Sequence, residues 1–360
     1  MSGVKVQTSY LRGYAGSIDA NATRSLGEIR RYCETHCKNT SGMDGTLRPA
    51  RWITGQMADH MLDLIGRAER TLTGTASDLR SSATFYDQAD EKSAEAVWAA
   101  ADKGFWDSTG VPKNYQEKNA QWSSGQDAKF SQGATFVLRP PAEHHEAQEL
   151  RHQVHGKVSW IDKIIKYLTG QDLLTKVMPI VLGDWGALRR VSEAWGQLAT
   201  AFRAVGDDLS EGLSKVSSHW DSSADGRSGA SRNFDYQIKG YLIPAFNEVA
   251  KICEAFRDAC QFMATFYEDC CRDLIFLLNW YGKKIRKAWI ALKSAYGMGL
   301  WPLLKNTTKL ISALWRAIED LIELIKTEYQ KYEDLVKLLI SGHEALLGRY
   351  RLNAFPETGK

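Results

Sequence analysis

The chain of 360 residues is 44% hydrophobic and 25% charged, with a formal net charge of +3. These values are typical of a soluble globular protein and leave room for two or three domains. No apolar run approaches the roughly 18 residues that a membrane-spanning helix needs. Residues 1–10 lack the basic and apolar regions of a secretory signal peptide, so any export is expected to follow a route without one.

Residues 1–103 predict an antiparallel helical hairpin. Apolar residues recur at intervals of three and four from Leu11 onwards and again from Met57 onwards, which predicts two helices that each bury one face. Residues 39–45 between them contain two glycines and have the composition of a tight turn. Pro49 suits the first turn of the returning helix. Because neither helix could bury its apolar face alone, the two are expected to pack on each other.

A second hairpin is expected after a linker. Glycine and proline interrupt residues 104–142, where the helical periodicity disappears. In residues 143–278 it returns, first as short lead-in helices and then as an apolar stripe of roughly nine turns that ends in a polar turn opened by Trp220. The returning stripe begins near Phe234, and Pro244 is expected to kink that helix or to delay its start.

Residues 279–360 predict a helical extension with an uneven charge distribution. Its last long helix carries apolar residues at the spacing of a helix packed on a bundle. Between Leu274 and Ile318 there are eight basic residues and no acidic one, together with seven aromatic side chains. Three explanations stay open: solvent-facing lysines of a buried helix pair, a membrane surface, or, least favoured, a nucleic acid. The candidate contacts of an anionic partner are Trp280, Lys283, Lys284, Arg286, Lys287, Trp289 and Trp301.

The sequence offers no catalytic or metal-binding motif. Four histidines and three glutamates lie in residues 143–155, but no His-Glu-x-x-His spacing occurs, so a solvated polar segment is the better interpretation. No phosphate-binding glycine loop and no nucleophile elbow is present. We therefore expect no enzyme activity, no catalytic residues, no metal and no cofactor.

The six cysteines predict core residues rather than a metal or redox motif. No Cys-x-x-Cys spacing occurs. Cys33 and Cys37, like Cys253 and Cys260, lie at helical spacing, where cysteine serves as a small apolar residue. An oxidising destination would allow one disulfide between the helices at most.

Three short motifs of the second hairpin carry a resemblance to a known family. They are residues 183–185 (Gly-Asp-Trp), residues 195–196 (Trp-Gly) in the long helix, and the Trp220 turn. Together with the returning helix they resemble the WXG-type hairpins that type VII secretion systems of Gram-positive bacteria export. The turn departs from the family's Trp-x-Gly, because serine stands in the place of the glycine and Gly226 follows later. The first hairpin resembles a shorter relative of the same superfamily.

The resemblance implies that such hairpins pair into four-helix bundles. It also implies that the export machinery reads a Tyr-x-x-x-Asp/Glu element near the returning helix. Tyr86 and Asp90 match this element and lie one turn apart on one helix face. Tyr329 and Glu333 match it as well, which is no more than chance predicts at this composition. Position favours Tyr86, since it lies at the end of a hairpin.

The two hairpins are complementary, because the first carries the tyrosine element and the second carries the tryptophan turn. We therefore expect an all-α protein of two long antiparallel helical hairpins plus a C-terminal helical extension. The hypothesis is that the hairpins dock on each other as a four-helix bundle, like a heterodimer fused into one chain. The alternative is two independent hairpins that each seek another chain.

The expected function is that of a type VII secretion substrate that binds proteins through its helix faces and catalyses nothing. Its expected partners are the type VII secretion machinery and another helical protein or a second copy of itself. It would be cytoplasmic before export and secreted or bound to the cell surface afterwards. Two alternatives share the fold. One is a membrane-active helical effector, pore-forming or interface-binding, that uses residues 274–304, and the other is a cytoplasmic chaperone or adaptor of a secreted toxin.

Overall fold

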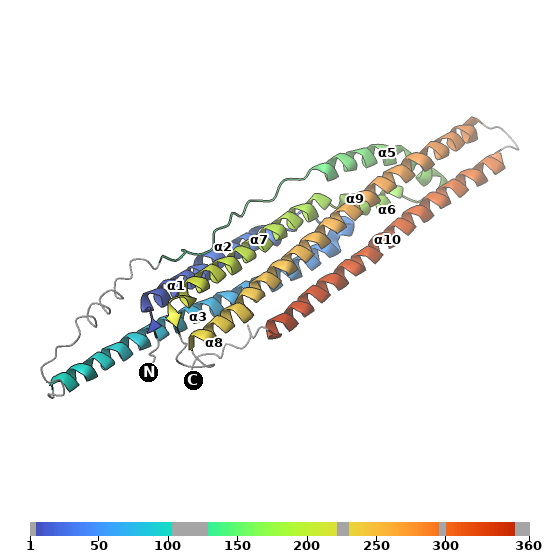
Figure 1. Ribbon diagram of the computed structural model, residues 1–360. Coiled ribbons are helices and arrows are strands. Elements are labelled where there is room, and N and C mark those ends of the chain that lie inside the picture. Colours follow the sequence, from blue (N-terminus) through green and yellow to red (C-terminus); the bar gives the residue numbers. More distant parts are fainter. Residues whose placement is uncertain (1–4, 103–128, 222–229, 295–299, 350–360) are drawn as a thin grey trace.

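The computed structural model describes residues 5–102, 129–221, 230–294 and 300–349. These residues form an elongated helical rod in which the long helices lie side by side along one axis (Figure 1). The expected all-α class with long helical hairpins is confirmed.

The first hairpin pairs a helix that contains two π-helical turns with one long returning helix. Gly42 and Gly45 have φ values of 91° and 61° and supply the left-handed backbone of the reversal, as the turn composition predicts. Pro49 is the second residue of the returning helix, where its missing N–H costs no helical hydrogen bond. The elements are α1 (Thr8–Ala20), a π-helical turn (Asn21–Ser25), α2 (Leu26–Tyr32), a second π-helical turn (Cys33–Cys37), a 3-10 turn (Gly45–Leu47) and α3 (Arg48–Asp102).

The second hairpin follows two lead-in helices. Asp172 and Asp184 cap the second lead-in helix and the long helix after it, because their carboxylates accept backbone N–H groups of the first turn. Pro244 is the second residue of the returning helix, and the expected irregularity is a π-helical turn just before it. The elements are α5 (Glu146–Thr169), α6 (Leu173–Leu182), α7 (Trp185–Ser217), α8 (Ala230–Gln237), a π-helical turn (Ile238–Leu242), α9 (Ile243–Ser294) and α10 (Leu300–Arg349).

The two hairpins dock on each other through polar contacts that α1 and the π-helical turn after it make with α7. The Tyr14 hydroxyl donates to the Leu209 carbonyl at 2.7 Å, and Asn21 Nδ2 donates to Asp208 Oδ2 at 2.6 Å. This close approach depends on Gly212, because a Cβ at that position would lie 2.4 Å from Cε2 of Tyr14. Burial raises the pKa of Tyr14 well above its usual value, so its hydroxyl stays a donor.

An extended strap formed by residues 129–142 runs along α1 and α7 (Figure 1). Asn21 Oδ1 accepts the Ala134 N–H at 2.8 Å. The Gln197 side chain accepts the Arg139 N–H at 2.5 Å and donates to the Arg139 carbonyl at 2.9 Å. The strap lies in the segment expected to be a linker, and it is bonded to one helix of each hairpin.

Helix α10 covers the outer face of α9, as its apolar spacing predicts. The Tyr332 hydroxyl lies 3.2 Å from Cys260 Sγ in this interface. The stripe of α10 that is buried contains Ile311, Leu314, Ile318, Leu321, Ile325, Tyr329, Tyr332 and Val336.

A pair of two-residue strands ties the N-terminal segment to the turn after α7. The strand β1 (Lys5–Val6) pairs antiparallel with β2 (Trp220–Asp221), so that Val6 lies opposite Trp220. Tyr10 stacks on His219 beside these strands, with the ring centroids 3.7 Å apart. The tryptophan turn is therefore fixed by the first hairpin as well as by its own.

Candidate functional site

Tyr86 and Trp220, which belong to different hairpins, lie in contact. Their ring centroids are 6.2 Å apart at an interplanar angle of 80°. Trp220 is 5% exposed, and its ring also packs against Phe234, with the centroids 5.8 Å apart. An edge-to-face arrangement at this distance is a favoured geometry of aromatic pairs. The folded chain thus joins the tyrosine of α3 to the tryptophan that follows α7.

An ion pair beside this aromatic contact holds α1 against α3. Arg12 pairs with Asp87, the residue after Tyr86. Tyr86 is half-buried, whereas its other neighbour, Phe85, is 68% exposed. Residue spacing does not predict the pair of Arg12 and Asp87, because two charged residues so far apart in the chain give no sign that they will meet.

One residue of the expected secretion signal, Asp90, and one of the expected turn motif, Gly226, lie partly or wholly outside the described residues. Asp90 lies in α3 one turn beyond Tyr86, and its side chain is outside the described residues. Gly226 also lies outside the described residues. The geometry described here is therefore that of Tyr86 from the expected signal and Trp220 from the expected turn motif.

The tryptophans of the other two family motifs are core residues. Trp195 packs against Phe256 of α9 with the ring centroids 4.7 Å apart, and Trp185 packs against Tyr267 at 6.4 Å. Both tryptophans are buried. They stabilise the α7 and α9 hairpin from within and offer no surface to a partner.

The second match to the tyrosine element lies inside the bundle. Tyr329 is 7% exposed in the interface of α10 with α9, and Glu333 pairs with Lys337 of the same helix. A receptor could not reach the Tyr329 ring without unpacking α10. Burial therefore favours Tyr86 over Tyr329 as the accessible match.

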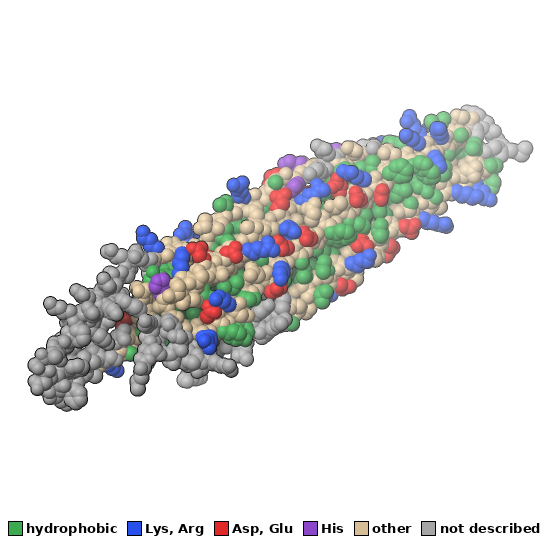
Figure 2. Space-filling model, viewed as in Figure 1, with side chains coloured by type: hydrophobic (Ala, Val, Ile, Leu, Met, Phe, Trp, Pro, Cys, Tyr) green, Lys and Arg blue, Asp and Glu red, His purple; other side chains and the backbone are tan. Residues whose placement is uncertain are grey.

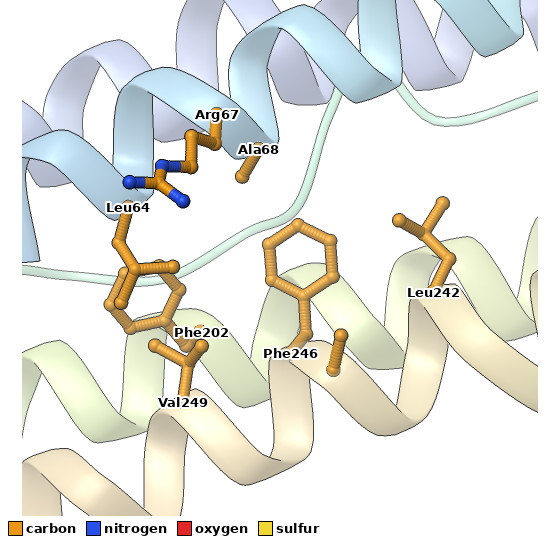
Figure 3. A pocket seen from close by; sticks show the side chains of 8 residues that line it. Leu64, Arg67, Ala68, Phe202, Leu242, Phe246 and Val249 are labelled. Atoms are coloured by element: carbon orange, nitrogen blue, oxygen red, sulfur yellow. The ribbon is translucent and has the colours of Figure 1, made fainter. Parts of the chain in front are cut away.

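An apolar groove marks the seam between the two hairpins (Figure 3). It contains about 20 Å³ of free space. Ligand sites for small molecules usually enclose about 300–1,000 Å³, so the groove is a packing seam and no ligand site. Its lining comes from α3, α7, the turn before α9 and α9 itself, namely Leu64, Arg67, Ala68, Phe202, Leu242, Ala245, Phe246 and Val249.

The residues expected to contact an anionic partner gather at one end of the rod, where α9 ends and α10 begins (Figures 1 and 2). Lys284 Nζ lies 3.2 Å from the ring centroid of Trp280, and Trp289 packs against Tyr167 of α5 at 5.3 Å. Within the described segments, none of the helices combines the length and apolar character that crossing a membrane requires. All seven are exposed or half-buried: Trp280, Lys283, Lys284, Arg286, Lys287, Trp289 and Trp301.

The histidine cluster and the cysteines form no metal centre in the described residues. There, no three or more His, Cys, Asp or Glu side chains come together as metal ligands would. His144 instead lies 3.0 Å from Glu193, next to the strap. All six cysteines are buried and none forms a disulfide, which fits their helical spacing.

Comparisons of this chain with protein-family models, with curated proteins and with solved structures find no match.

Proposed function

We propose that the chain is a type VII secretion substrate in which two WXG-type hairpins are fused and docked. Its two halves would present the tyrosine element and the tryptophan turn side by side without a second chain. In this proposal the protein acts by binding, through helix faces, to the secretion machinery and to a helical partner or a second copy. It performs no catalysis.

The contact between Tyr86 and Trp220 carries this proposal. In the family that the sequence resembles, hairpins pair, and the export element of one member is read in that pair. Here the first hairpin already contacts α7 of the second, through the hydrogen bonds of Tyr14 and Asn21. This supports the fused arrangement over two independent hairpins.

Export into the culture medium of an actinobacterial host tests the proposal. Wild-type chain is compared with Tyr86→Ala, Asp90→Ala and Trp220→Ala in cell pellet and filtrate, and with wild-type chain in a strain that lacks the secretion ATPase. Phe85→Ala is the matched control, because this neighbouring aromatic side chain faces solvent and is not part of the motif. We expect wild type and the control in the filtrate. The three variants, and wild type in the strain that lacks the secretion ATPase, should stay in the cell pellet.

Retention of every chain in the pellet, wild type included, would contradict the proposal. The cytoplasmic chaperone or adaptor of a secreted toxin would then be the better explanation of the same fold. Equal export of Tyr86→Ala and Phe85→Ala would instead remove Tyr86 from the signal.

A further inference from the structure

At one end of the rod, α5 meets the consecutive helices α9 and α10, which lie more than 70 residues later in the sequence (Figure 1). The second half of α5 lies against the end of α9, so closely that a Cβ on Gly282 would be 2.7 Å from Cδ1 of Ile161. Arg286 lies over the Trp160 ring at 6.0 Å. We call the described residues 160–169, 276–294 and 300–305 the basic aromatic tip.

The tip gathers positive charge from two separate parts of the sequence. Lys163 and Lys166 of α5 join the acid-free end of α9 and start of α10. Among the described residues, Lys163 and the four lysines of α9 in the tip have no carboxylate partner within ion-pair distance. Those four are Lys283, Lys284, Lys287 and Lys293.

Two carboxylates near the tip, Asp162 and Asp172, accept hydrogen bonds from the backbone at the start of α6. Asp162 is buried, and its Oδ1 accepts the Leu173 N–H at 2.6 Å. Asp172 caps the same helix and pairs with Lys166. Asp162 is buried and Asp172 pairs with Lys166, so neither carboxylate pairs with Lys163 or with the lysines of α9 in the tip.

Large apolar side chains are exposed among these cations. Tyr167 is 78% and Trp301 73% exposed. An open hollow of about 620 Å³ lies between Lys163 and Lys293, with Tyr167, Trp289 and Leu292 among its other walls. Figure 2 shows hydrophobic side chains at this end of the rod with Lys and Arg around them. Such a patch is costly to leave in water and therefore indicates a binding surface.

We propose that the basic aromatic tip binds the surface of a bilayer rich in anionic phospholipids. Tyr167, Trp280 and Trp301 lie at the level of the headgroups and upper acyl chains, and the lysines contact the lipid phosphates. Aromatic rings with one polar edge favour this boundary, and each nearby lysine adds attraction to anionic lipid. The chain would lie on the membrane and not cross it.

The mixture of side chains favours a lipid surface over a nucleic acid. Ile290 is exposed beside the aromatic rings, and Leu292 lines the hollow. Aliphatic groups gain from acyl chains but cannot stack on bases, whereas single-stranded nucleic acid is held by aromatic platforms along a charged track. Lys284 and Lys293 lie over the rings of Trp280 and Trp289, which leaves those faces covered.

Vesicle flotation with the full chain tests this proposal. The vesicles contain either phosphatidylcholine alone or an equimolar mixture of phosphatidylglycerol and phosphatidylcholine. We expect binding to the mixed vesicles only, with a loss when salt rises from about 0.1 to about 1 M, since the Debye length falls from about 10 to about 3 Å. Equal binding to both vesicle types, or none to either, would overturn the proposal.

Charge reversal at the tip provides the decisive variant. Lys283→Glu, Lys287→Glu and Lys293→Glu, combined in one chain, should weaken binding to the mixed vesicles roughly 100-fold. The control combines Arg48→Glu, Arg51→Glu and Lys92→Glu, which are equally exposed, lie on α3 and give the same net charge. A further variant combines Tyr167→Ala with Trp301→Ala and leaves the net charge unchanged. It should weaken binding to the mixed vesicles roughly tenfold.

All of these side chains are exposed, so helicity and thermal midpoint should not change, and circular dichroism checks this. Equal loss in the tip variant and the control would show that only total charge matters and would overturn the assignment to the tip. Binding of a single-stranded oligonucleotide that depends on the tip, without vesicle binding, would replace the lipid by a nucleic acid. Purified protein is used throughout, so lipid binding is measured independently of export.

Discussion

The ring of Tyr86 meets the ring of Trp220 edge to face, across 134 positions of sequence and across two hairpins. Neither residue could reach the other within its own hairpin. The contact exists because α1 docks on α7 and because β1 holds the Trp220 strand in place. At this contact, side chains of the two hairpins lie next to each other.

Energetic coupling between these rings is the first prediction. In a double-mutant cycle with Tyr86→Ala and Trp220→Ala, the free energy of unfolding should show a coupling of about 0.5–1.5 kcal/mol. Trp220→Ala alone should cost about 3–5 kcal/mol, because the side chain is buried. Urea denaturation measures all four chains. A parallel cycle with Phe85→Ala in place of Tyr86→Ala should be additive, and coupling of equal size there would contradict the contact.

Glycine at position 212 sets the distance between the hairpins. Gly212→Ala places a Cβ 2.4 Å from the buried Tyr14 ring and should destabilise the fold by about 1–3 kcal/mol. Gly206→Ala, on the same helix, meets nothing closer than 3.6 Å and should stabilise by about 0.5–1 kcal/mol. Thermal unfolding of the two variants compares them directly. Shifts of the same sign would argue against close docking of α1 on α7.

The strap should depend on one glutamine. Gln197→Ala removes both hydrogen bonds to Arg139, so the Arg139 amide should exchange about five- to tenfold faster. Hydrogen exchange read by mass spectrometry at the peptide level detects this. Thr200→Ala is the control, because that hydroxyl bonds only to its own helix. If the Arg139 amide of Gln197→Ala exchanges as slowly as in wild type, contacts other than those of Gln197 hold the strap.

A buried carboxylate between α7 and α9 should contribute strongly to stability. Glu268 accepts hydrogen bonds from Arg189 and Arg272, and its side chain is 12% exposed. Glu268→Ala removes the buried carboxylate that Arg189 and Arg272 share and should cost about 3–5 kcal/mol. Glu211→Ala, which breaks the exposed pair with Lys215, should cost less than about 1 kcal/mol. Chemical denaturation that gives equal costs would contradict the burial of Glu268.

Alkaline pH should weaken the fold through its thiols. Burial raises the pKa of Cys260 to about 12 and, with help from Asp273 and Asp269, that of Cys270 to about 12. An unfolded thiol loses its proton near pH 8.5, so above that pH the unfolded chain binds fewer protons than the folded chain. The free energy of unfolding should therefore fall as pH rises from about 9 to about 12.

The variant Cys260→Ala isolates this effect from the tyrosines, which also titrate in this range. Its stability should lie below that of wild type near pH 7, where wild type keeps the packing of the sulfur. The gap in the free energy of unfolding should narrow as pH rises toward 12, because only wild type loses the contribution of the Cys260 thiol. Urea titrations at each pH measure the gap, and a constant gap would contradict the raised thiol pKa.

Much of the local structure follows from residue spacing. Apolar residues at intervals of three and four predict each long helix, because only that spacing keeps one face out of water. Gly42 and Gly45 predict the first reversal, since L-residues with side chains disfavour its backbone angles. The positive charge at the end of α9 is also a property of the sequence, as is the burial of cysteines at helical spacing.

Only the tertiary structure decided which faces meet. Spacing states that a helix has an apolar side but not which other side covers it, so the docking of α1 on α7 could not be read from the chain. Asn21 and Asp208 carry one signal for this docking, because polar residues within buried stripes need hydrogen-bond partners. The same limit applies to the contact of Tyr86 with Trp220. It applies also to Lys163 of α5 and Lys293 of α9, which line the same hollow only because their helices pack together over a long sequence separation.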